Sequence, residues 1–400
     1  MAASAASLAA LPRAERGRFS ARSRASASRA VSSRASRLAR VRPRAAGFEP
    51  ALVDGAALRA ASHDERRAML LGALRASRGV VLIRGGLADL SPSELVAFSR
   101  AVGDDVERNP GVATRFLLPD HPEIQRIGNA IDPATGERVA MFSRAPPLPR
   151  DPVTGAETIA YDPVAHSPVW HTDQAFREPP PFASLLYCRA HPPPGDGGDT
   201  VFADCVAAYD ALSDEDKARI DDLDAICSYA HHNAKVKKRT PSYPLLTPEE
   251  RAKNPPVFQP VARAVREYYV RSSESQSSES ARSSGADEKD ERSSQRRRSV
   301  YGFSSAVCAV VLRGERVEGA LLDRYELEGE EDASVRALMY ETLLPHCTRE
   351  AFTYRHAWKV GDVVLWDNLR TIHAATPFDE AKDREMWRTT VAAPGEGWGR

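Results

Sequence analysis

The segment Trp170-His171-Thr172-Asp173 constrains the fold of this chain more than any other stretch. In an extended backbone, side chains two residues apart point to the same face, so His171 and Asp173 can approach one ion together. An imidazole and a carboxylate on one face supply two of the three ligands of a 2-His-1-carboxylate site, which suits Fe(II) and leaves open positions on the metal. The fold must therefore bring a third ligand to this segment from elsewhere.

The histidines that could supply this third ligand differ in their surroundings. Two are adjacent and would face opposite ways on a strand, and three lie beside prolines in expected loops; these are His231 and His232, and His121, His191 and His346. His373 differs from them because it follows an expected strand that ends in Leu365-Trp366-Asp367-Asn368. It also precedes two arginines that are four residues apart, Arg384 and Arg388.

Two segments differ from the rest of the chain in composition. Residues 1–46 are mainly Ala, Ser and Arg, with Glu15 as the only acidic residue, which is typical of an organelle transit peptide. We expect a chloroplast location, with the mitochondrion as the alternative, and a basic tail that binds an anionic partner as the rival interpretation. Residues 271–300 are mostly Ser, Glu, Arg, Lys, Asp and Gln, so we expect a disordered insert there.

Residues 47–400 are expected to form one mainly β domain with flanking helices. The residue patterns predict helices at 64–77, from Ser91 onward, at 204–223 as a pair, and at 332–344. They predict strands at 80–83, 123–131, 183–190, 352–358, 363–366 and 386–391. The β-rich flanks of the insert, 257–270 and 300–312, predict a hairpin with an expanded turn; a domain boundary is the alternative.

Charge and cysteine content exclude several classes of function. The 55 Lys and Arg residues balance 55 Asp and Glu residues, so nothing predicts a general attraction to nucleic acid or to a membrane surface. No apolar run approaches the roughly 18 residues that a membrane-spanning helix needs. The five cysteines have no Cys-x-x-Cys spacing, which favours buried thiols in a reducing compartment over a zinc site or a disulfide framework.

Four stretches, in this order, resemble the Fe(II)/2-oxoglutarate-dependent oxygenases of the taurine dioxygenase and 2,4-D dioxygenase family. They are Trp170 to Asp173, Gly197-Gly198-Asp199-Thr200, the run from Phe352 to Asn368, and His373 with Arg384 and Arg388 eleven and fifteen residues later. The resemblance covers roughly residues 50–395. It implies a double-stranded β-helix (jelly roll) with helices packed outside.

The resemblance also implies a role for each matching residue. His171, Asp173 and His373 would bind Fe(II), and 2-oxoglutarate and O2 would be co-substrates. Arg384 and the hydroxyl of Thr200 would hold the distal carboxylate of 2-oxoglutarate. Arg388 would bind an anionic group of the substrate. Asn109 stands where taurine dioxygenase has a further sulfonate-binding histidine, which argues against taurine as the substrate.

The expected activity is hydroxylation of a small anionic molecule, a carboxylate or a sulfonate, with release of succinate and CO2. Two alternatives are a different outcome of the same iron chemistry, such as desaturation, and a non-catalytic jelly-roll binding protein. A third is an interaction protein that works through residues 1–46 and 271–300. The sequence leaves the oligomeric state open, including a homo-oligomer.

Overall fold

A computed structural model describes residues 47–108, 116–129, 131, 136, 170–239, 241, 243–265, 297–379 and 381–394 of the chain. The expected transit peptide, residues 1–46, lies outside these ranges, as do Asn109 and residues 271–296 of the expected insert. The described part is mainly β with flanking helices, as the sequence predicted.

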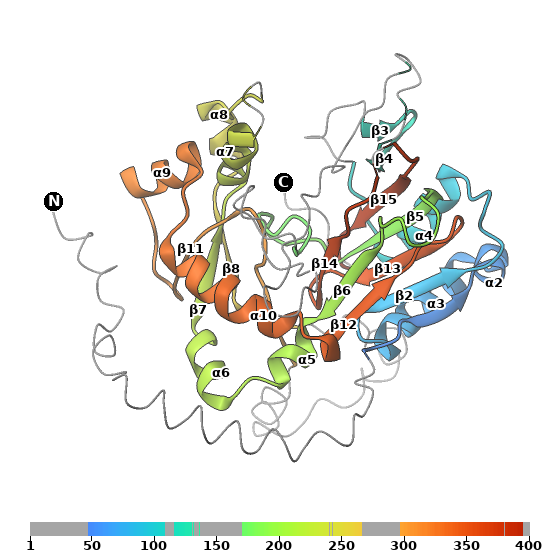
Figure 1. Ribbon diagram of the computed structural model, residues 1–400, viewed down its shortest axis with the longest axis horizontal. Coiled ribbons are helices and arrows are strands. Elements are labelled where there is room, and N and C mark those ends of the chain that lie inside the picture. Colours follow the sequence, from blue (N-terminus) through green and yellow to red (C-terminus); the bar gives the residue numbers. More distant parts are fainter. Residues whose placement is uncertain are drawn as a thin grey trace, which may run out of the picture. The chain divides into compact units, whose positions relative to one another are not determined.

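Strands from all parts of the domain build a seven-stranded sheet (Figure 1). Only its first two strands pair in parallel, and all other neighbours are antiparallel. In sheet order the strands are β1 (Ala51–Asp54), β2 (Val80–Arg84), β13 (Val363–Asp367), β5 (Ala183–Ala190), β15 (Glu385–Val391), β4 (His121–Gly128) and β3 (Leu117–Leu118). Most of these strands match the predicted ranges closely; β1 was not predicted, and β4 includes His121, which had been expected in a loop.

A three-stranded sheet packs against one face of the larger sheet. It consists of β12 (Thr353–His356), β6 (Thr200–Asp204) and β14 (Thr371–Ala375), all antiparallel. Phe202 of β6 lies in one apolar cluster with Leu82, Val364 and Trp366, and its ring centroid is 5.6 Å from that of Trp366. Because side chains alternate along a strand, these residues define the inner face of the larger sheet.

Helices cover the opposite face of the larger sheet. Val81 and Leu185, whose side chains alternate with the inner ones, pack in a second cluster with Leu70 and Leu74 of α3 (His63–Ala76) and with α4 (Pro92–Val102). The first turn of α4 forms because the Ser91 hydroxyl accepts a hydrogen bond from the Glu94 amide while the Glu94 carboxylate accepts one from the Ser91 amide. Both helices were predicted, α4 from its capping residues and α3 from the helical spacing of its apolar residues. The short helix α2 (Gly55–Ala60) precedes them.

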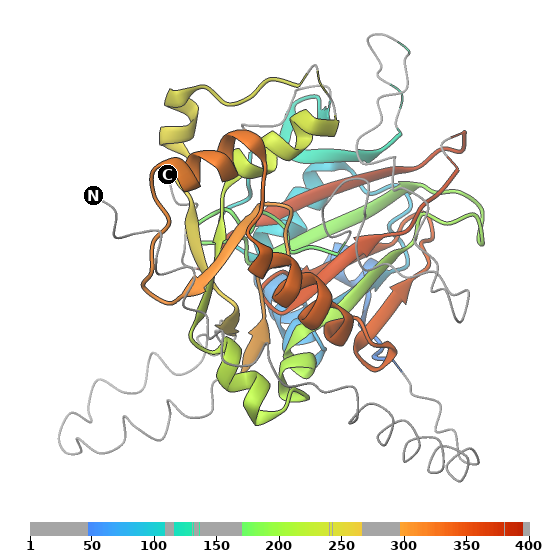
Figure 2. The ribbon, with the colours of Figure 1, turned by 60° about the vertical axis from the view of Figure 1, so that its left-hand side comes forward.

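A third sheet and most remaining helices form the other side of the domain. The sheet order is β11 (Val307–Leu312), β7 (Leu223–Cys227) and β8 (Val257–Pro260). The helices are α5 (Cys205–Asp210), α6 (Asp214–Ile220), α7 (Tyr229–Arg239), α8 (Pro248–Lys253), α9 (Ala320–Glu328), α10 (Leu344–Cys347) and the 3-10 turn Glu350–Phe352. Figure 2 shows α7 and α9 side by side above this sheet.

The helix predicted at 332–344 has an unexpected geometry. Residues Val335–Leu343 form a π-helix, with one more residue per hydrogen-bonded turn than an α-helix. The Thr342 hydroxyl donates to the Ala337 carbonyl, five residues earlier, which matches this wider turn. An apolar repeat predicts that a helix forms here, but it does not distinguish α from π geometry, since both bury Val335, Met339 and Leu343.

The predicted hairpin around the insert forms only next to the insert, because the rest of the two predicted flanks, β8 and β11, pairs with β7 instead. Strand β9 (Ala262–Ala264) pairs antiparallel with β10 (Arg298–Val300), and the Val265 amide donates to the Arg297 carbonyl. The insert was therefore predicted to extend too far, because its last residues belong to a strand. Val300 is buried and the Ser299 hydroxyl donates to the Leu369 carbonyl, so these residues are part of the packed structure.

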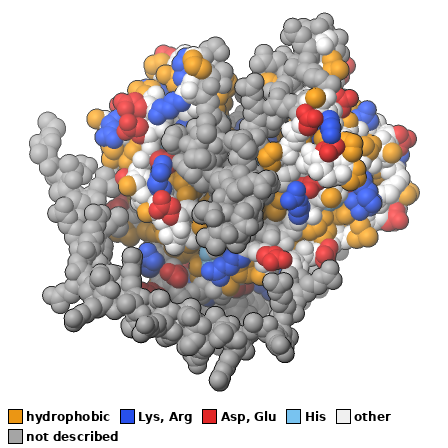
Figure 3. Space-filling view, viewed as in Figure 1, with side chains coloured by type: hydrophobic (Ala, Val, Ile, Leu, Met, Phe, Trp, Pro, Cys, Tyr) orange, Lys and Arg blue, Asp and Glu red, His pale blue; other side chains and the backbone are white. Residues whose placement is uncertain are grey.

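Charged side chains of both signs lie on the described surface. On the face drawn in Figure 3, basic and acidic side chains are interspersed and do not separate by sign. No helix in the described ranges is long and apolar enough to cross a membrane.

Candidate active site

Two backbone hydrogen bonds join His171 to His373, which lies 202 residues later in the sequence. The His171 amide donates to the His373 carbonyl at 2.9 Å, and the His373 amide donates to the His171 carbonyl at 3.0 Å. His373 lies on β14, which pairs on its other side with β6. The backbone at His171 therefore borders the smaller sheet. This pairing brings the third expected ligand, His373, to the segment that holds His171 and Asp173.

The side chain of Asn368 fixes the end of this segment. Its Oδ1 accepts a hydrogen bond from the Asp173 amide at 2.9 Å, and its Nδ2 donates to the carbonyls of Asp173 and Pro181. The Thr172 amide donates to the Phe303 carbonyl at 2.8 Å. Asn368 is fully buried, so all of these bonds form away from solvent. The backbone on both sides of the Asp173 carboxylate is thus held by polar contacts.

His171, Asp173 and His373 bring their ligand atoms within 4.8 Å of one another. Asp173 Oδ1 lies 3.8 Å from His171 Nε2 and 3.9 Å from His373 Nε2. These two separations are below twice a typical metal–ligand bond of about 2.1 Å, so one ion can bridge each pair. Two imidazole nitrogens and one carboxylate oxygen form a donor set that suits Fe(II), so the residues present fit this metal.

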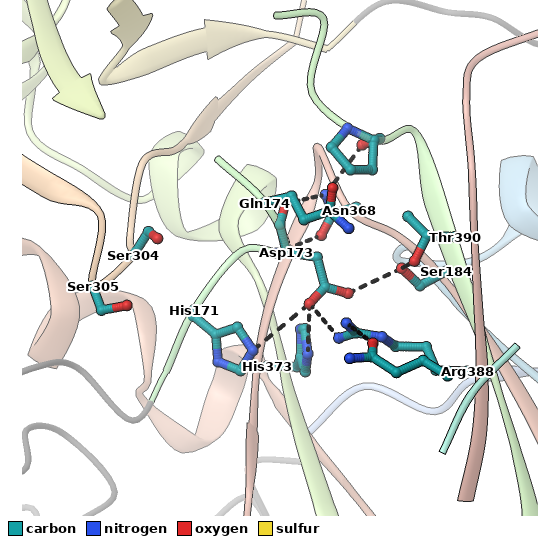
Figure 4. A network of polar contacts seen from close by, with 12 residues as sticks. His171, Asp173, Gln174, Ser184, Ser304, Ser305, Asn368, His373, Arg388 and Thr390 are labelled. Carbon is teal, nitrogen blue, oxygen red and sulfur yellow. Dashed lines mark hydrogen bonds and ion pairs between the residues drawn. The ribbon is translucent and has the colours of Figure 1, made fainter. Parts of the chain in front are cut away.

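The charge of Asp173 is stabilised by its neighbours. Oδ1 accepts a hydrogen bond from Arg388 Nη1 at 2.8 Å, and Oδ2 accepts one from the Ser184 hydroxyl at 3.0 Å (Figure 4). Burial raises the pKa of Asp173, but Arg388 and the two histidines outweigh it and lower the pKa to about 2. The side chain is therefore a carboxylate, the form that binds a cation, at any ordinary pH.

Burial keeps His373 neutral. Desolvation, with a smaller contribution from His171, lowers its pKa to about 3, although Asp173 opposes the shift. Its ring is 4.9 Å from that of Trp366, and its Nδ1 has no hydrogen-bond partner in the described structure. A neutral imidazole keeps the lone pair that a metal ligand needs. His171 is the more open of the two ligands, with 38% of its side chain exposed.

The Gly197-Gly198-Asp199-Thr200 loop needs its two glycines for space. Both have positive φ values, and a Cβ at Gly197 would lie 1.9 Å from the Pro377 carbonyl oxygen. A Cβ at Gly198 would lie 2.9 Å from the His191 ring and 3.3 Å from Arg384. The glycines thus allow the loop to approach Arg384 closely.

Arg384 is a buried cation without a carboxylate partner. Its Nε donates to the Gly198 carbonyl at 3.1 Å, and no ion pair to it occurs within the described residues. The nearby carboxylate of Asp199 is bound instead by Arg355, at 2.7 Å. Burial lowers the pKa of Arg384 to about 10, so it remains charged at neutral pH. A buried guanidinium of this kind is suited to an anionic ligand, which it can bind through two parallel hydrogen bonds.

Some of the predicted site residues lie together in the structure and others do not. The three expected metal ligands lie together, and Thr200 is buried two residues from the carbonyl that Arg384 contacts. Arg388 lies at the cluster, with Asp173 and Gln125 as its partners, so a contact with substrate stays a prediction. Asn109 lies outside the described residues. Of the rejected histidines, His231 and His232 lie on α7 and not on a strand, and His346 lies on α10.

Four residues of the site were missed in the sequence. They are Ser184, Gln125, Asn368 and Trp358, which contact Asp173, Arg388, the metal segment and Thr200. Ser184 could have been noticed as a polar residue within the apolar strand Ala183–Ala190, and Asn368 as a polar residue directly after a buried strand. No feature of the sequence marks Gln125, and Trp358 lies within the matching run from Phe352 to Asn368 without a role assigned to it.

A family model described as "Taurine catabolism dioxygenase TauD, TfdA family" matches residues 40–390. The alpha-ketoglutarate-dependent 2,4-dichlorophenoxyacetate dioxygenase of Burkholderia sp. (strain RASC) is 30% identical over 223 residues, which are 56% of this chain and 57% of that protein. The chain thus spans a little over half the length of this relative. Pentalenolactone F synthase of Streptomyces avermitilis is 26% identical over 333 residues, 80% of this chain and 84% of that protein.

Solved structures show the same fold. The crystal structure of AAD-2 in complex with Mn(II) and N-oxalylglycine has a TM-score of 0.56 at 24% identity, and covers 87% of this chain and 96% of that one. A taurine dioxygenase from Burkholderia xenovorans has a TM-score of 0.52 at 23% identity, and covers 87% and 88% of the two chains.

Proposed function

Since this chain belongs to the TauD, TfdA family of dioxygenases, we propose that it is an Fe(II)- and 2-oxoglutarate-dependent oxygenase. It oxidises a small anionic substrate with O2 and converts 2-oxoglutarate to succinate and CO2. In the balanced reaction, one oxygen atom enters succinate and the other becomes the hydroxyl group of the product. The observation that carries this proposal is the convergence of His171, Asp173 and His373, with ligand atoms within 4.8 Å.

The three converging residues would hold Fe(II), which supplies the oxygen-activating chemistry that no side chain provides. The chain's own contribution is to orient the ligands. Ser184 and Arg388 fix the two oxygens of Asp173, and Asn368 fixes the backbone on which Asp173 stands. These outer contacts limit the ligand geometry in the way that metal sites generally require.

The co-substrate pocket would be formed by Arg384 and Thr200. The buried Arg384 guanidinium binds the distal carboxylate of 2-oxoglutarate, and the Thr200 hydroxyl donates a second hydrogen bond to it. Burial strengthens this ion pair, because water is excluded from both partners. An arginine suits this role because its planar guanidinium can bind both oxygens of a carboxylate.

The two facing sheets support a jelly-roll architecture. We infer that the seven-stranded sheet and the sheet β12-β6-β14 are the two halves of a double-stranded β-helix. Phe202, Trp366 and their neighbours would fill its interior, and the metal segment would close one end through the pairing of His171 with His373.

The substrate would lie on the open side of His171, beside an aromatic wall. Phe176 follows Asp173 by three residues, and its ring centroid lies 4.9 Å from Tyr229 and 6.4 Å from His232. His232 Nδ1 is 2.7 Å from the Ser305 hydroxyl, and Figure 4 draws Ser305 on the His171 side of the cluster. These half-buried rings suit an apolar or aromatic group of the substrate.

Relatives support an anionic substrate. Their names specify 2,4-dichlorophenoxyacetate, (S)-phenoxypropionate and sulfate esters as substrates of those proteins. Arg388 is the cation nearest to Asp173 and would pair with the substrate anion. We propose a carboxylate or a sulfonate as this group.

Succinate formation tests the proposed activity. The full chain with Fe(II), ascorbate and 2-oxoglutarate should form succinate faster when a suitable substrate is added from a panel of aryloxy acids, other carboxylates, sulfonates and sulfate esters. The His373→Ala variant should lose this activity. Failure of the wild-type protein to bind 2-oxoglutarate, together with no succinate from any member of the panel, would overturn the proposal.

We also propose that residues 1–46 direct the protein to the chloroplast, on the basis of their Arg- and Ser-rich, acid-poor composition. A fluorescent protein fused to this segment should accumulate in chloroplasts. Accumulation in mitochondria or in the cytosol would contradict this location.

A further inference from the structure

Trp358 makes a buried hydrogen bond with a residue of the proposed co-substrate pocket. Its Nε1 donates to Thr200 Oγ1 at 3.1 Å, and both residues are at most 5% exposed. Thr200 Oγ1 makes no other hydrogen bond within the described part of the chain. Among the described residues, Trp358 is therefore the one hydrogen-bond partner of this hydroxyl.

This bond determines the direction of the Thr200 hydroxyl proton. An indole N–H can only donate, so the hydroxyl oxygen must accept in the bond to Trp358. The hydroxyl proton is then directed away from the indole and remains available for a ligand. A buried hydroxyl proton without a hydrogen-bond acceptor is unfavourable. The site therefore favours an anionic ligand, whose oxygen can accept this proton.

The indole is itself held in place by a chain of contacts. The Trp358 ring packs edge-on against His356, with centroids 4.4 Å apart. His356 Nδ1 lies 2.8 Å from the Tyr354 hydroxyl, and its Nε2 lies 3.2 Å from Asp362. Asp362 in turn binds the Arg84 guanidinium through two bonds of 2.6 and 2.7 Å. Rotation of the indole would disturb this packed set, so the donor has a fixed direction.

We propose that Trp358 is a positioning residue for 2-oxoglutarate, acting through Thr200. Its N–H orients the Thr200 hydroxyl so that the proton meets the same carboxylate that Arg384 binds. Arg384 lies against the same loop, through its contact with the Gly198 carbonyl. This role rests on the proposed function, since it concerns the distal carboxylate of the proposed co-substrate.

The Trp358→Phe variant tests this role, because it keeps an aromatic ring and removes the donor. Calorimetry with Mn(II) measures the Kd of 2-oxoglutarate and of 2-oxobutyrate, which lacks the distal carboxylate. We expect 2-oxoglutarate to bind about 3- to 10-fold more weakly, the value of one neutral hydrogen bond, and 2-oxobutyrate to bind unchanged. Thr200→Val should weaken 2-oxoglutarate similarly, and the double variant should add nothing further.

Trp387→Phe is the matched control. It removes an indole N–H that donates to Glu385 Oε1, from a ring that packs in the cluster on the helix-covered side of the large sheet. This variant should bind both keto acids as the wild-type protein does.

Two results would overturn the inference while leaving the proposed function intact. One is an unchanged Kd of 2-oxoglutarate in Trp358→Phe, and the other is equal weakening of both keto acids. If wild-type protein binds no 2-oxoglutarate, the proposed function fails first. Should Trp358→Phe not fold, 15N-labelled tryptophan in the wild-type protein gives a second measurement. The Trp358 indole signal should shift with 2-oxoglutarate and not with 2-oxobutyrate, and an unchanged signal contradicts the role.

Discussion

At the scale of single residues, Arg384 shows how a binding site can cost stability. The residue is 4% exposed, and its guanidinium has no ion pair among the residues that the structure describes. Removing a cation from water without a paired anion is unfavourable, and an apolar side chain of similar volume avoids this cost. The residue is thus better suited to a complex with an anion than to the protein alone.

Arg384→Met should separate stability from co-substrate binding. Without 2-oxoglutarate we expect the melting temperature to rise by about 1–3 °C, since about 1 kcal/mol of desolvation cost is removed. The increase in melting temperature that 2-oxoglutarate causes in the wild-type protein with Mn(II) should disappear. Differential scanning fluorimetry measures both. Arg189→Met, which changes an exposed arginine above Trp387, should keep the ligand-induced increase; if Arg384→Met keeps it too, the assignment of Arg384 is wrong.

Asp362 makes stability depend on acidity. Burial raises its pKa, but Arg84 and His356 outweigh this and lower it to about 2. A carboxyl with a lowered pKa in the folded protein stabilises above the unfolded value near 4, and this contribution is lost as pH falls toward 2. Asp362→Asn should therefore lower the free energy of unfolding by about 1–2 kcal/mol at pH 7, and the difference should shrink between pH 4 and pH 2.

Urea denaturation of both proteins at several pH values measures this difference. Asp323→Asn serves as the control, because the Asp323 side chain is 58% exposed and lies 3.5 Å from its arginine. A difference between wild type and Asp362→Asn that stays constant from pH 7 to pH 2 would show that the ion pair is not the cause.

The residues of the site differ in how far the sequence could predict them. His171 and Asp173 follow from a spacing of two in an extended segment, which is local information. Asn368 and Ser184 contact Asp173 from 195 and 11 residues away, respectively, and these contacts depend on which strands become neighbours. The pairing of β5 with β13 and β15 cannot be derived from local pattern. His373 was distinguished by its position after an expected strand, and the family resemblance implied its role as a ligand; the structure places it against His171.

At the scale of elements, the sequence predicts best those helices and strands whose ends depend on contacts within the element itself. Ser91 and Glu94 fix the start of α4 through bonds within one turn, so the sequence locates it well. The helix α7, with its two adjacent histidines, was not predicted, although the Ser228 hydroxyl accepts a hydrogen bond from the His231 amide at its start. Its buried face is determined by packing against α9 and β11, which are distant in sequence.

The hairpin of β9 and β10 predicts that the segment between its strands can be shortened. The Val265 amide donates a hydrogen bond to the Arg297 carbonyl, so the two residues that flank this segment are adjacent. Replacing residues 266–296 by Asn-Gly would supply a two-residue turn with the twist that a hairpin favours. We expect a melting temperature within about 2 °C of the wild type, and an unchanged Kd of 2-oxoglutarate. A large loss of either would show that the segment contributes to the fold or to the site.

At the scale of the whole domain, the site joins parts of the chain that are far apart in sequence. The metal segment is bonded to His373 of β14, to Phe303 ahead of β11, and to Asn368 after β13. An ion held by His171, Asp173 and His373 would add a further link between these parts. A site assembled only in the folded domain gives binding energy that adds to folding stability.

A divalent ion should therefore raise the stability of the domain before any reaction takes place. At 100 times its Kd, Mn(II) should stabilise the folded protein by about 2.7 kcal/mol, or about 5 °C in melting temperature, and EDTA should reverse the effect. Asp173→Asn should abolish this increase, because a neutral amide replaces the carboxylate that both histidines face at 3.8 and 3.9 Å. Asp210→Asn, at an exposed position, should keep it. Stabilisation by Mn(II) that persists in Asp173→Asn would place the ion elsewhere and would remove the structural basis of the proposed reaction, whatever the substrate.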